Sequence, residues 1–480
     1  MTVLTNHQAY AVVMGAGITG LTIATELSEC YPGRVILLEK TAGVGGLAST
    51  STIQGLSFDT GSHRLHESCD PLVLRLIGEL CRADLLRRER RGLMFLGGRT
   101  LAYPPTVCDL LSVFGLPTMF GFITDLVRAR TAQLRLAGAP LEDFESFTIS
   151  RVGRSLYERF YKPYAWKLYG RPPRELAKDP AEHRVRKFSC AGVLRDIAQK
   201  VRGKPSFYLY PANGIGQLSQ ALRQRFLSNR GTLICAAAVD RLPITSRGMV
   251  ERISFTNDRG DTESIHAEVV VSTIPLEALH HLVTSYGDAS NTPRFDLRWR
   301  GLRLLHVITK DRFVGDNETY YFPDPDVVFG RVSELHQYSP VLNQRSGVTA
   351  LTIEIPCSPG EPIWLASDDP LSEDCIVKLR DMGVLRASTN AVVESCSQRF
   401  PAVYPIYDLG WKKRFQPVYE RLDAVENLYM IGRTALFLHC NIDHCMLMGI
   451  KLARHLANAP ANKTRWRPVQ EAFFSYRVRE

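Results

Sequence analysis

The chain has 480 residues, of which 45% are hydrophobic and 22% charged, and its net charge is +10. This composition suits a large buried core and more than one compact unit, which excludes an intrinsically disordered chain. The basic surplus accompanies no nucleic-acid-binding motif, so we expect a small-molecule partner and no nucleic acid. Eleven scattered cysteines without a CxxC pair predict reduced thiols and a cytoplasmic location.

The N-terminal segment is predicted to form a strand–loop–helix–strand unit. Ala11–Met14 is an apolar strand, Leu21–Cys30 has helical periodicity, and Arg34–Glu39 is a second strand that ends in an acid. The loop Gly15–Gly20, with the sequence GAGITG, joins the first strand to the helix. This order of elements is typical of a dinucleotide-binding fold.

At each of the three glycine positions of this loop there is a physical reason for glycine. Gly15 permits the tight turn, Gly17 lets a pyrophosphate approach the bare backbone, and Gly20 lets helix and strand pack closely. The helix N-terminus offers free N–H groups to phosphate oxygens. Glu39, 19 residues after Gly20, is placed to accept hydrogen bonds from a ribose diol.

A second glycine loop, Gly43–Ser49, follows the acidic strand end within a few residues. Its glycine pair, its spacing and the strand after it resemble the second fingerprint of the flavin amine-oxidase superfamily. In that superfamily the loop runs past the pyrophosphate towards the flavin. The resemblance therefore implies that the cofactor is FAD rather than NAD.

The segment Leu110–Val127 is apolar over 18 residues. It contains Pro117, two glycines and Asp125, which suit a buried or lid-forming helix pair better than a membrane span. We therefore expect no transmembrane segment.

The remaining chain is predicted to form two domains. Strand patterns near Gly231–Val239, Val250–Asn257 and Ala267–Pro275 extend the first unit, so an FAD-binding domain would comprise residues 1–61, 213–275 and 404–460. Residues 62–212 and 276–403 would form an inserted, mixed α+β substrate-binding domain, and 461–480 a C-terminal tail. The expected fold class is α/β, with a Rossmann-like FAD-binding domain of the glutathione-reductase type.

The chain returns to the nucleotide domain over Asn427–Leu452. A strand at Leu428–Ile431 is followed by the turn Gly432–Arg433, and Asn441–His444 then leads into a helix. Asp443 lies where this helix begins, so its neighbours can offer N–H groups to an anion or to flavin oxygens.

With these pieces placed, the sequence resembles the protoporphyrinogen-oxidase-like proteins and UDP-galactopyranose mutases of the flavin superfamily. Four segments carry the resemblance in order: Gly15–Gly46, Phe58–His66, Tyr164–Leu176 with Arg184 and Arg186, and Gly432–Arg433 with Asn441–His444. Two positions depart from the mutases, since Tyr169 replaces a tryptophan and His439 a diphosphate-binding tyrosine. These departures count against galactopyranose mutase activity.

The resemblance implies a set of site residues. Those implied for the cofactor are Gly15, Gly17, Ile18, Thr19, Gly20, Glu39, Lys40, Gly45, Gly46, Leu47, Ala48, Gly61, Ser62, His63, Val239, Thr273, Gly432, Arg433, Asn441, Ile442 and Asp443. Those implied for the substrate are Tyr164, Tyr169, Arg184, Arg186 and His439. The catalytic candidates are His63, His66 and Arg433, because imidazole can transfer a proton near pH 7 and guanidinium matches phosphate oxygens.

Each assignment has a structural alternative. Val239 would bring a backbone group to the adenine or would be an ordinary core valine. The histidines would move protons or would only shape the flavin pocket, the arginines would clamp a diphosphate or form surface ion pairs, and the tyrosines would stack a base or pack. No set of His, Cys and carboxylate residues shows metal-ligand spacing, so no metal is expected.

Three functions remain open. The leading hypothesis is an FAD-dependent oxidoreductase that passes a hydride from a polar, sugar- or nucleotide-linked small molecule to flavin N5. The alternative is a redox-neutral UDP-sugar pyranose/furanose mutase that uses reduced FAD as a nucleophile. A non-catalytic carrier, similar to the escort proteins of small GTPases, is the third, and the intact glycine loops count against it. The oligomeric state stays open.

Overall fold

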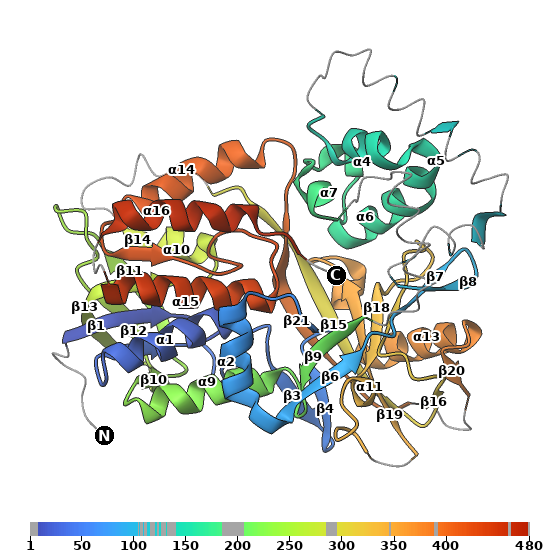
Figure 1. Cartoon of the computed structure of the whole chain (residues 1–480), viewed down its shortest axis with the longest axis horizontal. Coiled ribbons are helices and arrows are strands. Elements are labelled where there is room, and N and C mark those ends of the chain that lie inside the picture. The colour runs from blue at the N-terminus through green and yellow to red at the C-terminus, as the bar shows by residue number, and fades with distance from the viewer. Residues whose placement is uncertain are drawn as a thin grey trace.

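The structure, a computed structural model, places two sheets next to each other with helices around them (Figure 1). It describes residues 8–103, 105, 109, 113–115, 121, 124–125, 131, 141–184, 206–284, 295–344, 347–387, 392–458 and 462–478.

The first sheet has a parallel half built from short, apolar strands. Its order is β10 (Thr232–Ile234), β2 (Val35–Leu38), β1 (Gln8–Met14), β13 (Thr262–Ser272) and β22 (Leu428–Met430). All four residues of β2 are buried, as expected for a parallel sheet that is covered on both faces. Parallel strands put their carboxyl ends at one edge, so the loops after β1, β2, β13 and β22 gather there.

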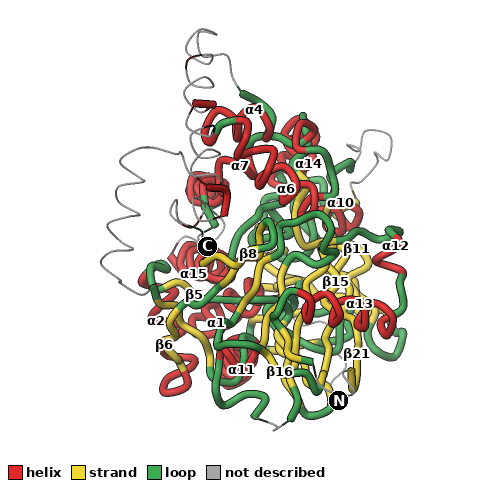
Figure 2. Tube along the Cα trace, turned by 90° about the vertical axis from the view of Figure 1, so that its right-hand side faces the viewer, coloured by secondary structure: helices red, strands yellow, loops and turns green. Residues whose placement is uncertain are grey.

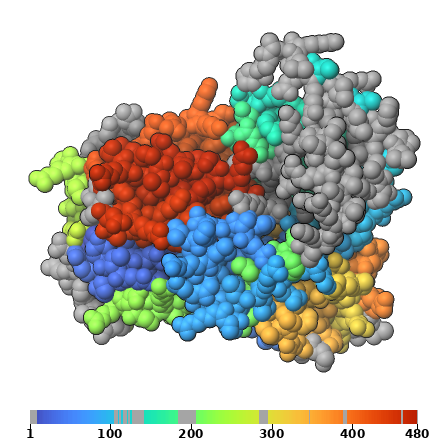
Figure 3. All heavy atoms as spheres, in the orientation of Figure 1, coloured from blue at the N-terminus to red at the C-terminus, as the bar shows by residue number. Residues whose placement is uncertain are grey.

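Helices cover one face of this sheet. They are α1 (Ile18–Cys30), α2 (Pro71–Cys81), α9 (Gly216–Ser228) and α15 (Ile442–Asn458). Helix α1 packs between α9 and α15, and Gly449 permits the close crossing because a Cβ there would lie 3.1 Å from the Ile23 nitrogen. Helix α2 lies beside α15 on the surface that Figure 3 shows.

Three further strands extend the first sheet beyond β13. They are β12 (Ile253–Thr256) and β11 (Ala238–Pro243), which pair antiparallel, and β14 (Val283–Thr284), which pairs parallel with β11, with α10 (Leu276–Leu282) beside them. The strand pattern predicted near Gly231–Val239 forms two strands rather than one. Strand β10 ends at Ile234, and the chain turns at Ala236, whose φ is 51°, before β11 begins.

The second sheet has the strand order β21–β15–β19–β18–β17–β7–β8. The bounds are β21 (Val392–Ile406), β15 (Arg298–Thr309), β19 (Thr349–Pro356), β18 (Arg331–Glu334), β17 (Thr319–Tyr321), β7 (Leu93–Leu96) and β8 (Arg99–Ala102). Its neighbours are antiparallel except for β7 and β17.

Short strands connect the two sheets. They are β3 (Thr50–Ile53), β4 (Leu56–Asp59), β5 (Leu65–His66), β6 (Leu85–Glu89) and β9 (Phe207–Pro211), while β16 (Arg312–Phe313) pairs with β20 (Leu385–Arg386). The segment between β4 and β5 contacts β19 of the second sheet through hydrogen bonds from Ser62 to Glu354.

A helical group lies at one end of the second sheet. It contains α4 (Phe144–Val152), α5 (Arg154–Leu156), α6 (Lys162–Tyr169) and α7 (Asp179–Arg184), with a π-turn at Tyr157–Tyr161 and 3-10 turns at Pro173–Glu175 and, elsewhere, Arg82–Asp84. Figure 2 shows α4, α6 and α7 gathered at one end of the molecule. The segment Leu110–Val127 falls largely outside the described residues.

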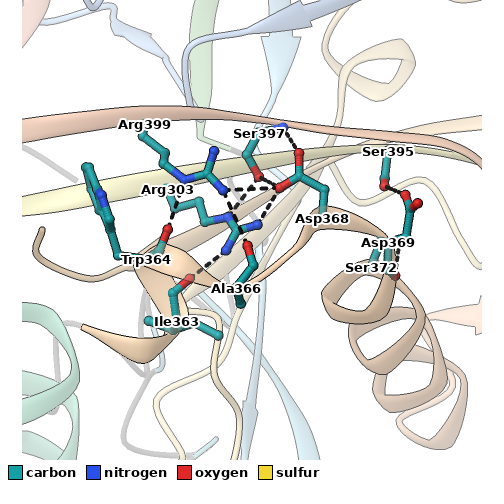
Figure 4. Close-up of polar contacts among 10 residues, drawn as sticks. All are labelled: Arg303, Ile363, Trp364, Ala366, Asp368, Asp369, Ser372, Ser395, Ser397 and Arg399. Carbon is teal, nitrogen blue, oxygen red and sulfur yellow. Dashed lines mark hydrogen bonds and ion pairs between the residues drawn. The ribbon is translucent and has the colours of Figure 1, made fainter. Parts of the chain in front are cut away.

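A buried arginine attaches a helix to the second sheet. Arg303 of β15 has no exposed surface, and it donates to Ser397 Oγ (2.8 Å) and the Ile363 carbonyl and pairs with Asp368. Figure 4 shows Arg303 and Arg399 converging on Asp368, at the start of α13 (Asp368–Asp381). Because its donors are used within the protein, Arg303 has a structural role. The neighbouring short helices are α11 (Leu335–Tyr338) and α12 (Pro362–Leu365).

The C-terminal segment packs on the first sheet. Helix α16 (Lys463–Glu471) and a 3-10 turn (Ala472–Ser475) bury Trp466 and Phe473 completely, next to α14 (Trp411–Asp423). Lys463 Nζ donates to the carbonyls of Asp423 and Val425, which attaches α16 to the end of α14. No helix within the described ranges is both long and apolar enough to cross a bilayer.

Candidate active site

The glycine loop after β1 is held by Thr273, the residue that follows β13. Thr273 Oγ1 donates to the carbonyls of Met14 (2.9 Å) and Gly15 (3.1 Å). Gly15 has φ of 97°, and a Cβ there would lie 2.6 Å from Thr273 Oγ1. A Cβ on Gly20 would lie only 1.8 Å from the Gly15 carbonyl oxygen. These two glycines are therefore required by packing, as the spacing predicts.

Gly17 differs from its neighbours because the space around it is open. No heavy atom of the described chain would lie within 4 Å of a Cβ on Gly17. Its φ of −69° is acceptable for any residue. Packing therefore gives no reason for glycine at this position, while close approach of a ligand to the backbone does.

The second glycine loop lies directly against the first. The Gly45 N–H donates to the Ala16 carbonyl (2.8 Å), and Gly17 and Gly45 form a parallel bridge. A Cβ on Gly46 would be 3.4 Å from Gly17 Cα. Two segments that are separate in the sequence thus form one backbone surface above the start of α1.

The start of α1 is free to bind an anion. Gly17 is the N-cap residue, no side chain of the described residues caps the helix, and its first turn carries no acid. The first N–H groups of a helix need acceptors, and phosphate oxygens supply them. The residues present here therefore fit a pyrophosphate.

Glu39 lies at the end of β2, beside the same loop. Its Oε2 accepts a hydrogen bond from the Ala16 N–H (2.7 Å), while Oε1 accepts from the Thr41 N–H (2.9 Å) and Thr41 Oγ1 (2.8 Å). An ionised carboxylate has about four lone-pair positions, so Glu39 keeps capacity for a ribose hydroxyl. Lys40, the next residue, is exposed.

A charged cluster of the second sheet contacts the segment that follows β4. Glu354 Oε1 accepts from the Ser62 N–H (2.9 Å) and Ser62 Oγ (2.7 Å), and Glu354 Oε2 accepts from Arg331 Nε (3.0 Å) and Nη2 (2.5 Å). The Glu354 side chain is only 3% exposed. Burial by itself raises the pKa of Glu354, but the Arg331 charge and the Ser62 hydrogen bonds outweigh it, so this pKa is lowered.

His63 is the residue after Ser62, which belongs to this cluster. His63 Nε2 lies 2.8 Å from the Thr60 carbonyl oxygen. A carbonyl only accepts, so Nε2 carries the proton and Nδ1 of the neutral ring is an acceptor. Burial lowers the pKa of His63, while the Thr60 carbonyl and Glu354 oppose the shift. His63 is therefore a neutral base at pH 7.

His66 has a different environment. Its Nδ1 accepts from the Ser68 N–H (3.1 Å) and lies 2.8 Å from Ser68 Oγ. His66 belongs to β5, where it pairs with Tyr208. The two candidate histidines thus have different surroundings, and His63 is the one whose pKa the charges of Glu354 and Arg331 influence.

Arg433 is near enough to His63 for its charge to lower the pKa of that ring. Its Nε and Nη2 donate to the Val403 carbonyl (3.0 and 2.6 Å), and Nη1 donates to the Cys440 carbonyl (3.1 Å). Its guanidinium lies 5.4 Å from the centre of the Tyr404 ring, and Tyr404 packs edge-on against His439. Within the described residues Arg433 has no carboxylate partner.

The remaining predicted cofactor residues lie in or near the two glycine loops and the start of α15. Gly432 follows β22, and a Cβ there would be 3.0 Å from Thr19 Oγ1. Ala48 is buried and Leu47 half-buried beside them, and Asn441, Ile442 and Asp443 open α15 with partly exposed side chains. Val239 lies in β11 and is also partly exposed. Gly61 lies against the Glu354 carboxylate.

The predicted substrate residues are distributed unevenly. Tyr164 is half-buried and stacks with Phe160, whereas Tyr169 is 3% exposed and belongs to the same core cluster as Tyr404. Arg186 and the Arg184 side chain lie outside the described residues. Substrate binding by these residues stays a prediction.

The sequence patterns missed Glu354, Arg331 and Tyr404. Glu354 interrupts the apolar strand Thr349–Pro356, and a charged residue at a buried strand position usually has a specific partner. That pattern indicates a buried charge but does not identify Arg331 or Ser62 as its partners.

Glycine loops at the carboxyl edge of a parallel sheet are typical of a nucleotide-binding fold. The chain belongs to the family of flavin-containing amine oxidoreductases, whose model matches residues 18–309. Its cofactor is accordingly FAD. Family membership supports an enzyme rather than a carrier.

Curated relatives match a limited segment. The chloroplast protoporphyrinogen oxidase 1 of Arabidopsis thaliana is 26% identical over 189 residues, which are 38% of this chain and 34% of that protein. The chloroplast protoporphyrinogen oxidase of Nicotiana tabacum is 26% identical over 186 residues, 38% of this chain and 33% of that protein. The match thus spans about a third of the length of these relatives.

Solved structures are similar over the whole fold. Reduced UDP-galactopyranose mutase has a TM-score of 0.79 at 21% identity, covering 96% of this chain and 98% of that chain. Wild-type putrescine oxidase bound to putrescine has a TM-score of 0.60 at 15% identity, covering 94% and 99%. At these identities the likeness shows the fold.

Proposed function

We propose that this protein is an FAD-dependent oxidoreductase that oxidises an anionic, sugar- or nucleotide-linked small molecule. The observation that carries the proposal is the Arg433 charge, which has no carboxylate partner within the described residues, lies over the Tyr404 ring and, like the Arg331–Glu354 pair, is near enough to His63 to influence its pKa. Arg331 and Arg433 are both near enough to His63 to lower its pKa. A positively charged site with aromatic neighbours favours a phosphorylated, polar substrate.

The same charges disfavour an amine substrate. A protonated diamine would enter a site where Arg433 lacks a carboxylate partner within the described residues and Glu354 is already paired with Arg331. Like charges in a partly buried site repel one another by several kcal/mol. The electrostatics therefore support a phosphate-bearing ligand over putrescine.

We further propose a role for each of two domains. Residues 1–61, 213–275 and 404–460 form a Rossmann-like, glutathione-reductase-type FAD-binding domain, and 62–212 with 276–403 bind the substrate. The Gly15–Gly20 loop and the start of α1 hold the pyrophosphate, and Glu39 holds a ribose. Bound FAD supplies the two-electron acceptor, while Arg433 and the Arg331–Glu354 pair orient the substrate. We also propose a cytoplasmic location.

Within this proposal His63 is the proton acceptor. Its neutral ring presents Nδ1, because Nε2 is committed to the Thr60 carbonyl. Oxidation of an alcohol carbon releases the hydroxyl proton as the hydride leaves, and a base within hydrogen-bond distance lowers that barrier.

We expect His63→Gln to keep FAD and lower the rate of substrate-dependent flavin reduction about 100-fold. The glutamine amide can still donate to the Thr60 carbonyl, so the loop is preserved. In the wild-type protein the rate should fall as the pH drops below the His63 pKa, which lies below 6.5, because protonation removes the base. Stopped-flow absorbance across pH 5–8, a range chosen to bracket the ordinary histidine pKa of about 6.5, measures both effects. An unchanged pH profile in His63→Gln would exclude this role.

A redox-neutral mutase is the second candidate, favoured by the full-length fold similarity to reduced UDP-galactopyranose mutase. The same anionic site would hold a nucleotide sugar. The two candidates differ in net electron flow, since a mutase needs reduced flavin and consumes no electron acceptor.

An anaerobic absorbance titration distinguishes them. The protein with bound FAD is mixed with a panel of nucleotide sugars and sugar phosphates, with putrescine as the cationic control. Bleaching of the flavin by an anionic compound supports the oxidoreductase. A flavin that stays oxidised, with sugar isomerisation only after dithionite is added, supports the mutase. Bleaching by putrescine alone would overturn the anionic-substrate proposal.

A further inference from the structure

Two cysteines at the start of α15 lie in contact with each other. The Sγ atoms of Cys440 and Cys445 are 3.7 Å apart, and the residues are 1% and 6% exposed. Cys440 ends the loop that follows the Gly432–Arg433 turn, and Cys445 lies in the first turn of α15. The Sγ atoms need to approach by less than 2 Å to reach the disulfide bond length of about 2.0 Å.

The surroundings of this pair favour a reactive thiolate. The contact with the Cys440 sulfur lowers the pKa of the Cys445 thiol, against an opposing effect of burial. The Thr19 hydroxyl and the charge and N–H of Arg433 add to this lowering. A thiolate in the first turn of a helix is also stabilised by the helix dipole.

The pair lies directly behind the cofactor loop. Thr19, which contacts Cys445, belongs to the Gly15–Gly20 loop, and the Gly432 N–H donates to Met448 Sδ (3.3 Å) in the next turn of α15. Arg433 Nη1 donates to the Cys440 carbonyl (3.1 Å). The dithiol is therefore buried from solvent but adjacent to the groups that bind FAD.

We propose that Cys440 and Cys445 are a redox-active dithiol that exchanges an electron pair with the bound FAD. On oxidation both S–H bonds break, one S–S bond forms, and two electrons and two protons leave the sulfurs. The FAD is the acceptor and becomes FADH2, so atoms and electrons balance. Because the thiols are buried and Thr19 of the cofactor loop contacts Cys445, bound FAD is a more accessible oxidant than a dissolved disulfide. This inference does not depend on which substrate the protein oxidises.

An anaerobic reductive titration counts the electrons. Protein with bound FAD, fully reoxidised by ferricyanide, should take up four electrons per FAD from dithionite: two for the flavin and two for the disulfide. Cys440→Ser and Cys445→Ser should each take up two. Cys375→Ser, which removes a buried cysteine from another core cluster, is the matched control and should take up four. Uptake of two electrons by the wild type would overturn the proposal.

Peptide mapping gives a second readout that needs no variant. The oxidised protein is denatured in iodoacetamide and digested with trypsin. The peptide between Arg433 and Lys451 carries both cysteines and should be unalkylated and two mass units lighter than the reduced peptide. FAD-free protein treated with air alone should keep both thiols alkylatable. A disulfide that forms equally without FAD would show that FAD is not the oxidant.

Discussion

Replacing Gly17 by alanine should leave the protein folded and remove its FAD. No heavy atom of the described chain meets the added Cβ within 4 Å, and the φ of −69° suits alanine. The methyl group would instead occupy the space where a pyrophosphate approaches the backbone at the start of α1. We expect at least a 100-fold loss of FAD affinity, which corresponds to about 2.7 kcal/mol. The ratio of flavin to protein absorbance after gel filtration, and equilibrium dialysis, measure the loss.

Two glycines of the same region provide matched controls. Gly43→Ala also meets no heavy atom of the described residues within 4 Å, and it should keep its flavin. Gly20→Ala should lose both flavin and fold, because its Cβ would lie 1.8 Å from the Gly15 carbonyl oxygen. Urea unfolding of the FAD-free proteins separates these cases. If Gly17→Ala retains flavin as the wild type does, the pyrophosphate does not pass over this residue.

Replacing Glu354 by alanine should destabilise the protein by about 3 to 5 kcal/mol. The change leaves Arg331 as an uncompensated, largely buried cation and removes the acceptor of both Ser62 hydrogen bonds. The segment that carries His63 would also lose its attachment to β19. The free energy of unfolding in urea, measured on FAD-free protein at pH 7, gives the size of the effect.

An exposed ion pair gives the control for Glu354. Arg34 and Glu268 are each 50% exposed, so Glu268→Ala should cost no more than about 1 kcal/mol. Combining Glu354→Met with Arg331→Met should recover part of the loss, because neither charge then remains unpaired. A cost for Glu354→Ala equal to that for Glu268→Ala would mean that Arg331 reaches solvent when its partner is removed.

The sequence by itself determined the nucleotide-binding unit. The strand, the Gly15–Gly20 loop, the helix and Glu39 follow one another within about thirty residues, so their geometry is set by local propensity and short-range sterics. The helix begins at Ile18, inside the loop, rather than at Leu21. This shift follows from Gly17 serving as the N-cap, a detail that periodicity of apolar residues does not show.

The candidate substrate site was decided by tertiary structure. Ser62 and Glu354 are 292 residues apart, yet they share two hydrogen bonds. Nothing local in the strand Thr349–Pro356 identifies the partner of its glutamate, because the partner depends on how the second sheet docks against the first. Likewise, the sequence proposed Tyr169 for the substrate, and only packing shows that its ring is buried.

The contact between Cys440 and Cys445 was also decided by tertiary structure, although the two residues are close in the sequence. Cys440 and Cys445 are five residues apart, a spacing that by itself indicates no disulfide and no CxxC motif. The sulfurs meet because the loop after Arg433 turns into α15 at Ile442, with Thr19 of the glycine loop alongside. The sequence thus determined which elements form and which cofactor they suit, since those depend on neighbouring residues. The contacts of Glu354 with its partners and of Cys440 with Cys445 were decided by the packing of elements from distant parts of the chain.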